Sequence, residues 1–112
     1  MPPFKSRKDL FPGALEMIVL QTLQQQPLHG YALVQHIKRS SNELLQVEEG
    51  SLYPALQRLE LNGWIEGDWG LSANNRRARF YKLTADGRKH LNQESIRYRQ
   101  VTGAVARIMG FA

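Results

Sequence analysis

The sequence predicts a mainly α-helical domain of the α+β class, with one small β-hairpin and a long C-terminal helix. Three observations predict this fold. Three stretches before residue 63 place apolar side chains at helical spacing, residues 64–83 alternate as two strands do, and the chain after residue 84 follows a heptad pattern. The length of 112 residues suits one domain with an appendage rather than two independent domains.

The N-terminal part of the chain is predicted to hold a flexible arm and two helices. Residues 1–9 combine two prolines with four charges and show no periodicity, so we expect a flexible arm. Pro27 marks the end of a first helix, whose apolar face is Leu15, Ile18, Val19, Thr22 and Leu23. A second helix follows the turn at residues 27–30 and stops near residues 40–42; its apolar side chains are Tyr31, Leu33, Val34 and Ile37.

A third helix is predicted over residues 50–62, with Gly63 as its stop signal. Its buried side is expected to be Leu52, Ala55, Leu56 and Leu59. Proline is tolerated in the first helical turn, where its missing N–H is not needed. Pro54 therefore places the expected start of this helix near Gly50 or Ser51.

The rest of the chain is predicted to form a hairpin and a final helix. Residues 64–69 and 78–83 have the pattern of short strands, and residues 70–75 form a polar tip between them. Thr84 is a good N-cap for the last helix, and Asp86 lies in its first turn, where the helix dipole favours an acid.

The last helix carries a seam at heptad spacing, apolar at all but one position: Leu91, Glu94, Tyr98, Val101, Val105, Ile108 and Ala112. A helix this long would leave part of that stripe uncovered within one chain. We therefore expect a homodimer, in which the contacts are made by Leu91, Tyr98, Val101, Val105 and Ile108.

The order helix, helix, helix, hairpin, helix is that of a winged helix-turn-helix module, whose third helix enters the major groove of DNA while the hairpin flanks it. We divide the chain into an arm at residues 1–9, a winged helix-turn-helix domain at 10–83 and a dimerisation helix at 84–112. The outward face of the third helix holds the expected DNA-reading residues, which are Ser51, Tyr53, Pro54, Gln57 and Arg58. For Tyr53 the alternative is a half-buried ring that packs on the wing.

The charge distribution supports a polyanionic partner. The formal net charge is +5, yet residues 1–62 hold six basic and six acidic side chains, so the second half carries the whole excess. The expected wing contacts to DNA are Arg76, Arg77, Arg79 and Lys82. For Arg79 and Lys82 the alternative is a structural ion pair with Glu66 or Asp68 across the hairpin.

Four segments resemble the PadR family of transcriptional regulators. They are GSLYPALQRLELNGWI at residues 50–65, RRARFYKLTADGRKHL at 76–91, LHGYAL at 28–33 and PGALEMIVLQTL at 12–23. The resemblance implies a dimeric winged-helix repressor that binds a palindromic operator through Ser51, Tyr53, Gln57 and the wing arginines. It also implies dimerisation through the C-terminal helix and release by a small-molecule effector. The short C-terminal part resembles the branch with a single helix, and it lacks the tryptophan on which drug-binding members stack their ligands.

Other functions fit the sequence less well. With no cysteine, no paired histidines and no glycine-rich phosphate loop, the chain is not expected to be an enzyme or to hold a metal or cofactor. No apolar run reaches the roughly 18 residues that cross a membrane, and charges stand where a signal peptide needs apolar residues, so we expect a cytoplasmic protein. A winged helix that binds only other proteins remains the alternative, although it would not need three arginines within residues 76–79.

Overall fold

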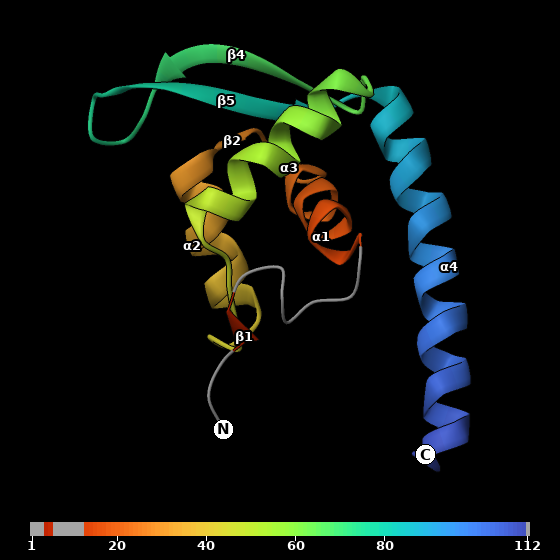
Figure 1. Cartoon of the computed structure of the whole chain (residues 1–112). Coiled ribbons are helices and arrows are strands. Elements are labelled where there is room, and N and C mark those ends of the chain that lie inside the picture. The colour runs from red at the N-terminus through yellow and green to blue at the C-terminus, as the bar shows by residue number, and fades with distance from the viewer. Residues whose placement is uncertain (1–3, 6–12, 112) are drawn as a thin grey trace.

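The computed structural model describes residues 4–5 and 13–111, and it confirms the predicted α+β fold with its order of helix, helix, helix, hairpin and helix. Figure 1 shows three packed helices, a hairpin that extends over them, and a long final helix to one side. The elements are β1 (Phe4–Lys5), α1 (Ala14–Leu23), β2 (Leu28–His29), α2 (Gly30–Ser40), β3 (Leu45–Gln46), α3 (Glu49–Leu61), β4 (Ile65–Leu71), β5 (Arg77–Leu83) and α4 (Ala85–Met109).

The core lies where α1, α2 and α3 meet the base of the hairpin. Its fully buried side chains are Val19 and Leu20 of α1, Leu33 of α2, Ile65 of β4, and the α3 residues Leu52, Leu56 and Leu59. Burial of each such aliphatic side chain contributes roughly 1.5–3 kcal/mol to folding. The whole predicted apolar side of α3 is buried, and this fixes which face of the helix remains exposed.

The hairpin is longer than predicted and belongs to a three-stranded sheet. Strands β4 and β5 pair antiparallel from Ile65↔Leu83 to Leu71↔Arg77, and the sequence did not predict β2, which adds to the other side of β5. The turn at residues 72–76 closes with a 2.8 Å bond from the Ser72 N–H to the Arg76 carbonyl. A second, two-residue sheet joins β1 to β3 in parallel. The other residues of the predicted arm lie outside the described part of the chain.

Helix α3 begins one or two residues earlier than predicted, at Glu49, so Pro54 is its sixth residue and not part of its first turn. The expectation for Pro54 was therefore wrong. A proline nitrogen cannot donate to the carbonyl four residues back, which here belongs to Gly50. The helix accommodates this loss because both Gly50 and Pro54 lie on the exposed side.

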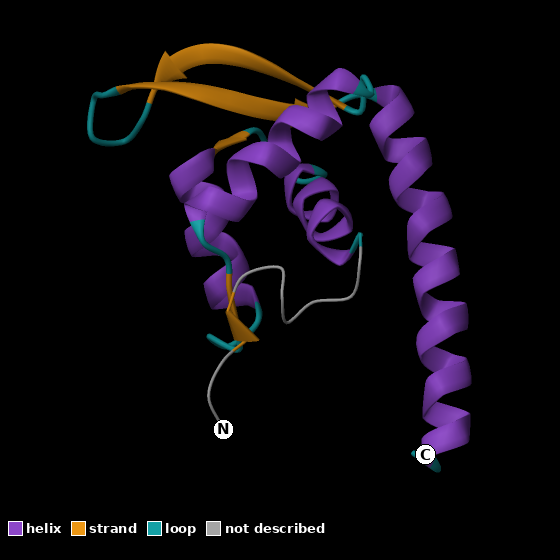
Figure 2. Cartoon of the chain, in the orientation of Figure 1, coloured by secondary structure: helices purple, strands orange, loops and turns teal. Residues whose placement is uncertain are grey.

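Helix α4 starts at a tightly bonded junction with the hairpin. The Thr84 hydroxyl caps the helix by accepting from the Gly87 N–H at 3.0 Å, as its N-cap position predicts, and it donates to the Gly63 carbonyl at 2.7 Å. The Thr84 N–H donates to the Trp64 carbonyl at 3.1 Å, and the Trp64 ring stacks on His90. From this junction α4 runs past α1, and its C-terminal half extends beyond the other helices (Figure 2).

Candidate DNA-binding surface

The predicted reading residues of α3 do not all face the same way. Pro54 and Gln57 are exposed on the side opposite the buried leucines. Tyr53 is turned toward the hairpin, where a shallow depression of about 370 Å³ is lined by Tyr53, Pro54, Gln57, Glu60 and Tyr81. Ser51 and Arg58 lie on the other flank of the helix, toward α1, as the helical repeat requires.

Tyr53 packs on α2 while it keeps 48% of its surface exposed. Its ring lies so close to Gly30 that a Cβ at that position would stand 3.0 Å from the tyrosine hydroxyl oxygen. A larger residue at the start of α2 would push the ring outward by a few tenths of an ångström. One side of the ring thus packs closely on α2, and the exposed side is accessible to a ligand.

Arg58 is engaged by the protein itself. Its guanidinium forms an ion pair with Glu16 of α1, 42 positions away in the sequence. Both side chains are partly exposed, so the pair contributes at most about 1 kcal/mol to stability. Glu16 occupies the Nε and Nη2 donors of Arg58, so a contact through these two donors requires the ion pair to open.

The hairpin has two faces because side chains alternate along each strand. Trp69, Arg77 and Arg79 share the face that continues the core side of the sheet, with Ile65 and Tyr81. The Arg77 guanidinium lies over the Trp69 ring at 4.6 Å from its centroid, which is a cation–π contact. Arg77 forms no ion pair among the described residues, and its charge is therefore available to a partner.

Arg79 connects the hairpin to α3 rather than to the neighbouring strand. Its guanidinium donates to the carboxylate of Glu60, and this hydrogen bond raises the pKa of Arg79 above its ordinary value. Burial is the main cause that raises the pKa of the adjacent Tyr81. The structural role considered for Arg79 thus exists with a different partner, because the sheet brings Arg79 over α3.

Lys82 lies on the opposite face of the hairpin. It pairs with Glu66 at 3.1 Å, the cross-strand partner considered from the sequence, and the bond raises the pKa of Lys82. The alternation along β5 directs Lys82 away from Tyr53 and Arg77. Lys82 therefore forms the cross-strand ion pair and does not lie with the other expected wing residues.

A large groove lies beneath the hairpin, between it and one side of α2, with Tyr53 of α3 also in its wall. We call it the under-wing groove. Its volume is about 950 Å³. It unites four predicted residues, which are Tyr53, Arg76, Arg77 and Arg79. It also contains the α2 side chains Tyr31, Gln35 and Arg39. Gln35 and Arg39 were not singled out from the sequence, and the prediction that Tyr31 lies on the apolar face of α2 was wrong, because its side chain is 60% exposed. No carboxylate is among the described residues that line this groove.

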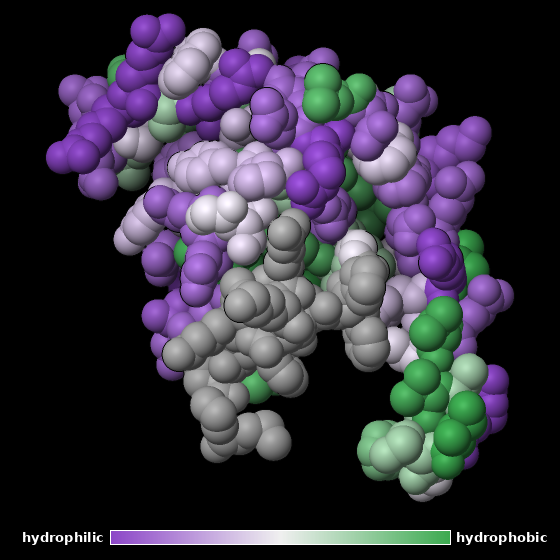
Figure 3. Space-filling view, in the orientation of Figure 1, coloured by the Kyte–Doolittle hydropathy of each residue, from purple (hydrophilic) through white to green (hydrophobic). Residues whose placement is uncertain are grey.

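The predicted dimerisation seam is exposed in its C-terminal part only. Tyr98, Val101, Val105 and Ile108 are 38%, 53%, 44% and 85% exposed, and hydrophobic side chains gather on this half of α4 (Figure 3). Leu91 is 3% exposed and belongs to the core of its own chain. The available seam therefore begins at Tyr98 and not at Leu91.

The described residues lack the features of two other classes of site. None of their helices has the length and hydropathy that a membrane span requires. Within the same residues, no cluster of histidine, aspartate or glutamate side chains has the geometry of a metal site.

Residues 19–93 match the transcriptional regulator PadR-like family. The chain belongs to this family. An uncharacterized protein X of Lysinibacillus sphaericus is 30% identical to this PadR-like protein over 87 residues, which are 78% of this chain and 80% of that protein. The PadR-like fold is thus assigned over the helices and hairpin that form the under-wing groove.

Solved structures of PadR-like and other regulators are similar along nearly the whole chain. A transcriptional regulator from Clostridium thermocellum is 27% identical with a TM-score of 0.80, over 88% of this chain and 96% of that chain. A PadR-like transcriptional regulator from Bacillus cereus is 26% identical with a TM-score of 0.75, over 88% and 93% of the two chains. This PadR-like protein is therefore a transcriptional regulator, and DNA binding is implied by the family.

Proposed function

We propose that this PadR-like protein is a cytoplasmic, sequence-specific repressor that binds a palindromic operator as a homodimer. The observation that carries the proposal is the position of Arg76 and Arg77, which are exposed and free of ion pairs among the described residues, beside the exposed polar face of α3. Such a surface is complementary to the phosphates and base edges of a duplex.

Base reading is assigned mainly to Gln57. It is exposed near the centre of the outward face of α3, and a glutamine amide can form two hydrogen bonds with adenine in the major groove. The hydroxyl groups of Tyr53 and Ser51 can donate to phosphate oxygens, and Pro54 is assigned a packing contact with the wall of the DNA major groove. Arg58 is assigned a contact to guanine or a phosphate, through the Nη1 donors that Glu16 does not use or after the ion pair opens.

Dimerisation is assigned to the exposed half of α4. The 25 residues of α4 span about 37 Å at the rise of an α-helix, and the exposed apolar stripe begins about halfway along it. A second copy of the stripe would cover Val101, Val105 and Ile108. Two copies of α3 would then read successive major grooves, about 34 Å apart on one side of the duplex.

A small-molecule effector is assigned to the pocket between α1, α2 and α4. Its volume of about 480 Å³ lies in the range of ligand sites, and its walls are mostly apolar, with Met17, Ile18, Ile37 and Leu91 among them. Tyr98 lines the same pocket and also belongs to the dimer seam. A ligand there would change the packing of α4 and hence the spacing of the two copies of α3.

The test is a titration of the protein into labelled DNA from upstream of its own gene at about 150 mM salt, with random DNA of equal length as competitor. Preferential binding of the upstream fragment is expected. Equal affinity for both fragments would contradict sequence-specific regulation at that site. A complete lack of binding would favour the alternative of a winged helix that binds only proteins.

A further inference from the structure

We propose that the under-wing groove binds one sugar-phosphate strand of the duplex, and that Tyr31, Gln35 and Arg39 of α2 form its third wall. The inference rests on the proposed DNA binding and adds α2 to the α3 and wing contacts assigned above. The strand in question is the one that separates the major groove entered by α3 from the minor groove beside the wing.

The α2 wall is a regular surface. Tyr31, Gln35 and Arg39 follow one another at four-residue spacing, so they lie along one side of the helix, and all three line the groove. Tyr31 is 60% exposed, and its ring is thus not required by the core. Arg39 is exposed and forms no ion pair with any residue that the structure describes.

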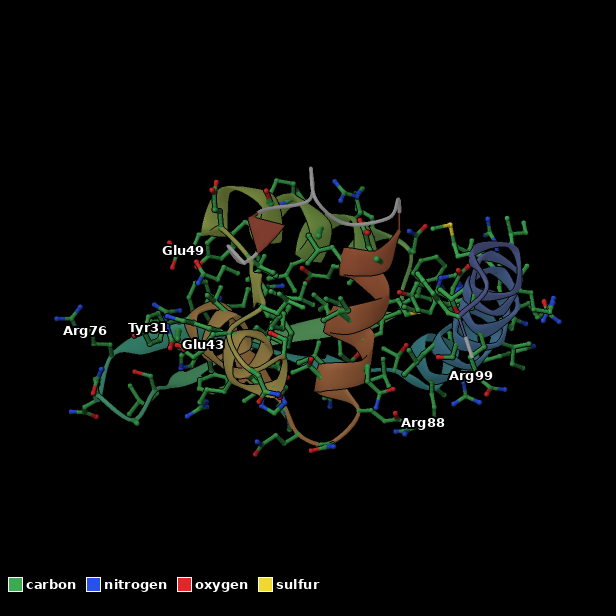
Figure 4. The ribbon with its side chains drawn as sticks, turned by 90° about the horizontal axis from the view of Figure 1, so that it is seen from below. Tyr31, Glu43, Glu49, Arg76, Arg88 and Arg99 are labelled. Atoms are coloured by element: carbon green, nitrogen blue, oxygen red, sulfur yellow. The ribbon has the colours of Figure 1, made fainter. Side chains whose placement is uncertain are left out.

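The facing wall is basic and aromatic. It is formed by Trp69, Arg76, Arg77 and Arg79 of the hairpin, and Figure 4 shows Arg76 and Tyr31 at the same end of the molecule, opposite Arg88 and Arg99 of α4. Only Arg79 among these arginines is neutralised, by Glu60. Together with Arg39, the two walls therefore offer three uncompensated positive charges and a hydroxyl from Tyr31.

The position of the groove determines which part of the DNA it meets. Tyr53 of α3 lines one end of it, and the hairpin turn, with Ser72 and Asn74, lines the other. With α3 in the major groove and the hairpin at the adjacent minor groove, the strand between the two DNA grooves must cross this space. The N-terminal residues of α2, Gly30 and Tyr31, also line the groove, and the positive end of the helix dipole favours a phosphate there.

The experiment compares Arg39→Ala, Arg39→Lys and the control Arg107→Ala by fluorescence anisotropy on a cognate and a random duplex. Arg107 is an exposed α4 residue that lies outside the under-wing groove and is not one of the seam residues Tyr98, Val101, Val105 and Ile108. Its loss therefore changes the net charge equally without removing a proposed DNA or dimer contact. Arg39→Ala is expected to lower the affinity for both duplexes by about tenfold or more, because it removes a charge-assisted hydrogen bond from each subunit. Its slope of log affinity against log salt becomes shallower by about one unit per lost phosphate contact. Arg39→Lys restores most of the affinity, and Arg107→Ala binds like the wild type.

A second measurement locates the contact. Single methylphosphonates, which are neutral, are placed in turn along the strand between the two DNA grooves. At the contacted position the wild type is expected to lose affinity, while Arg39→Ala is insensitive to the same substitution. The inference is overturned if Arg39→Ala binds as tightly as the wild type, or if it remains sensitive to neutralisation at every position. Failure of the wild type to bind any duplex would instead contradict the proposed function itself.

Discussion

Gly87 permits the close contact between α4 and the hairpin, and its replacement by alanine tests how the long helix is attached. A Cβ at this position would lie 1.9 Å from the Trp64 carbonyl oxygen and 2.8 Å from Leu83 Cδ1. The Trp64 carbonyl oxygen is part of the hydrogen-bonded backbone, so it cannot move aside as the end of a flexible side chain can. The start of α4 must therefore shift, and the bonds that Thr84 makes to Gly63 and Trp64 lengthen with it.

The expected effect of Gly87→Ala follows from three contributions. Overpacking costs about 1–3 kcal/mol, the weakened cap costs about 1 kcal/mol, and the better helix propensity of alanine returns about 0.5–1 kcal/mol. We expect a net loss of about 1–3.5 kcal/mol in the free energy of unfolding, and a fall in Tm of roughly 4–20 °C.

The matched control is Gly103→Ala in the same helix. A Cβ there would have only the end of the flexible Arg107 side chain nearby, at 3.7 Å. Gly103→Ala should therefore stabilise the protein by about 0.5–1 kcal/mol. Urea unfolding at equal protein concentration measures both variants. The account of the junction is refuted if Gly87→Ala is as stable as the wild type, or if both substitutions shift stability in the same direction.

Val105→Asp places a charge in the exposed apolar stripe of α4 and should convert a dimer to a monomer in sedimentation equilibrium. The control Gln100→Asp, at another exposed position of the same helix, should leave the dimer intact. An unchanged dimer mass for Val105→Asp would place the interface elsewhere. Glu60→Gln removes the negative charge that pairs with Arg79, so it should raise the affinity for any DNA duplex severalfold. The same substitution should cost at most about 1 kcal/mol of stability. Weaker DNA binding would show that the ion pair itself positions the wing. If a dimer neutralises about six to eight phosphates, log affinity should fall with log salt with a slope of about −5 to −7, and a flat response would exclude the electrostatic contribution.

The sequence predicted the elements that have their own local pattern. The stop at Gly63 and the Thr84 cap are found where the pattern places them. So are the apolar faces of the first three helices, except at Tyr31, which is 60% exposed. Strand β2 was not predicted, because two residues have no periodicity and this strand exists only through its pairing with β5. The longer hairpin has the same cause, since its last pair, Leu71↔Arg77, depends on the turn.

The candidate site was less predictable because its details depend on contacts between distant residues. The ion pair of Arg58 with Glu16 joins two helices, and only the packed structure brings them together. Arg79 was compared with acids across the hairpin, yet its partner is Glu60 of α3. Gln35 and Arg39 of α2 were not singled out from the sequence, because only the packed structure places them opposite the wing.

The central claim is that α3 reads the DNA sequence while the wing supplies affinity for any duplex. The most direct test is the ratio of the affinity for cognate DNA to that for random DNA, measured for Gln57→Ala and Arg77→Ala. Gln57→Ala should lose about 1–3 kcal/mol on the cognate duplex and little on random DNA, so that the ratio falls. Arg77→Ala should lower the affinity for both duplexes equally and leave the ratio unchanged. Equal losses on both duplexes for Gln57→Ala would contradict the claim.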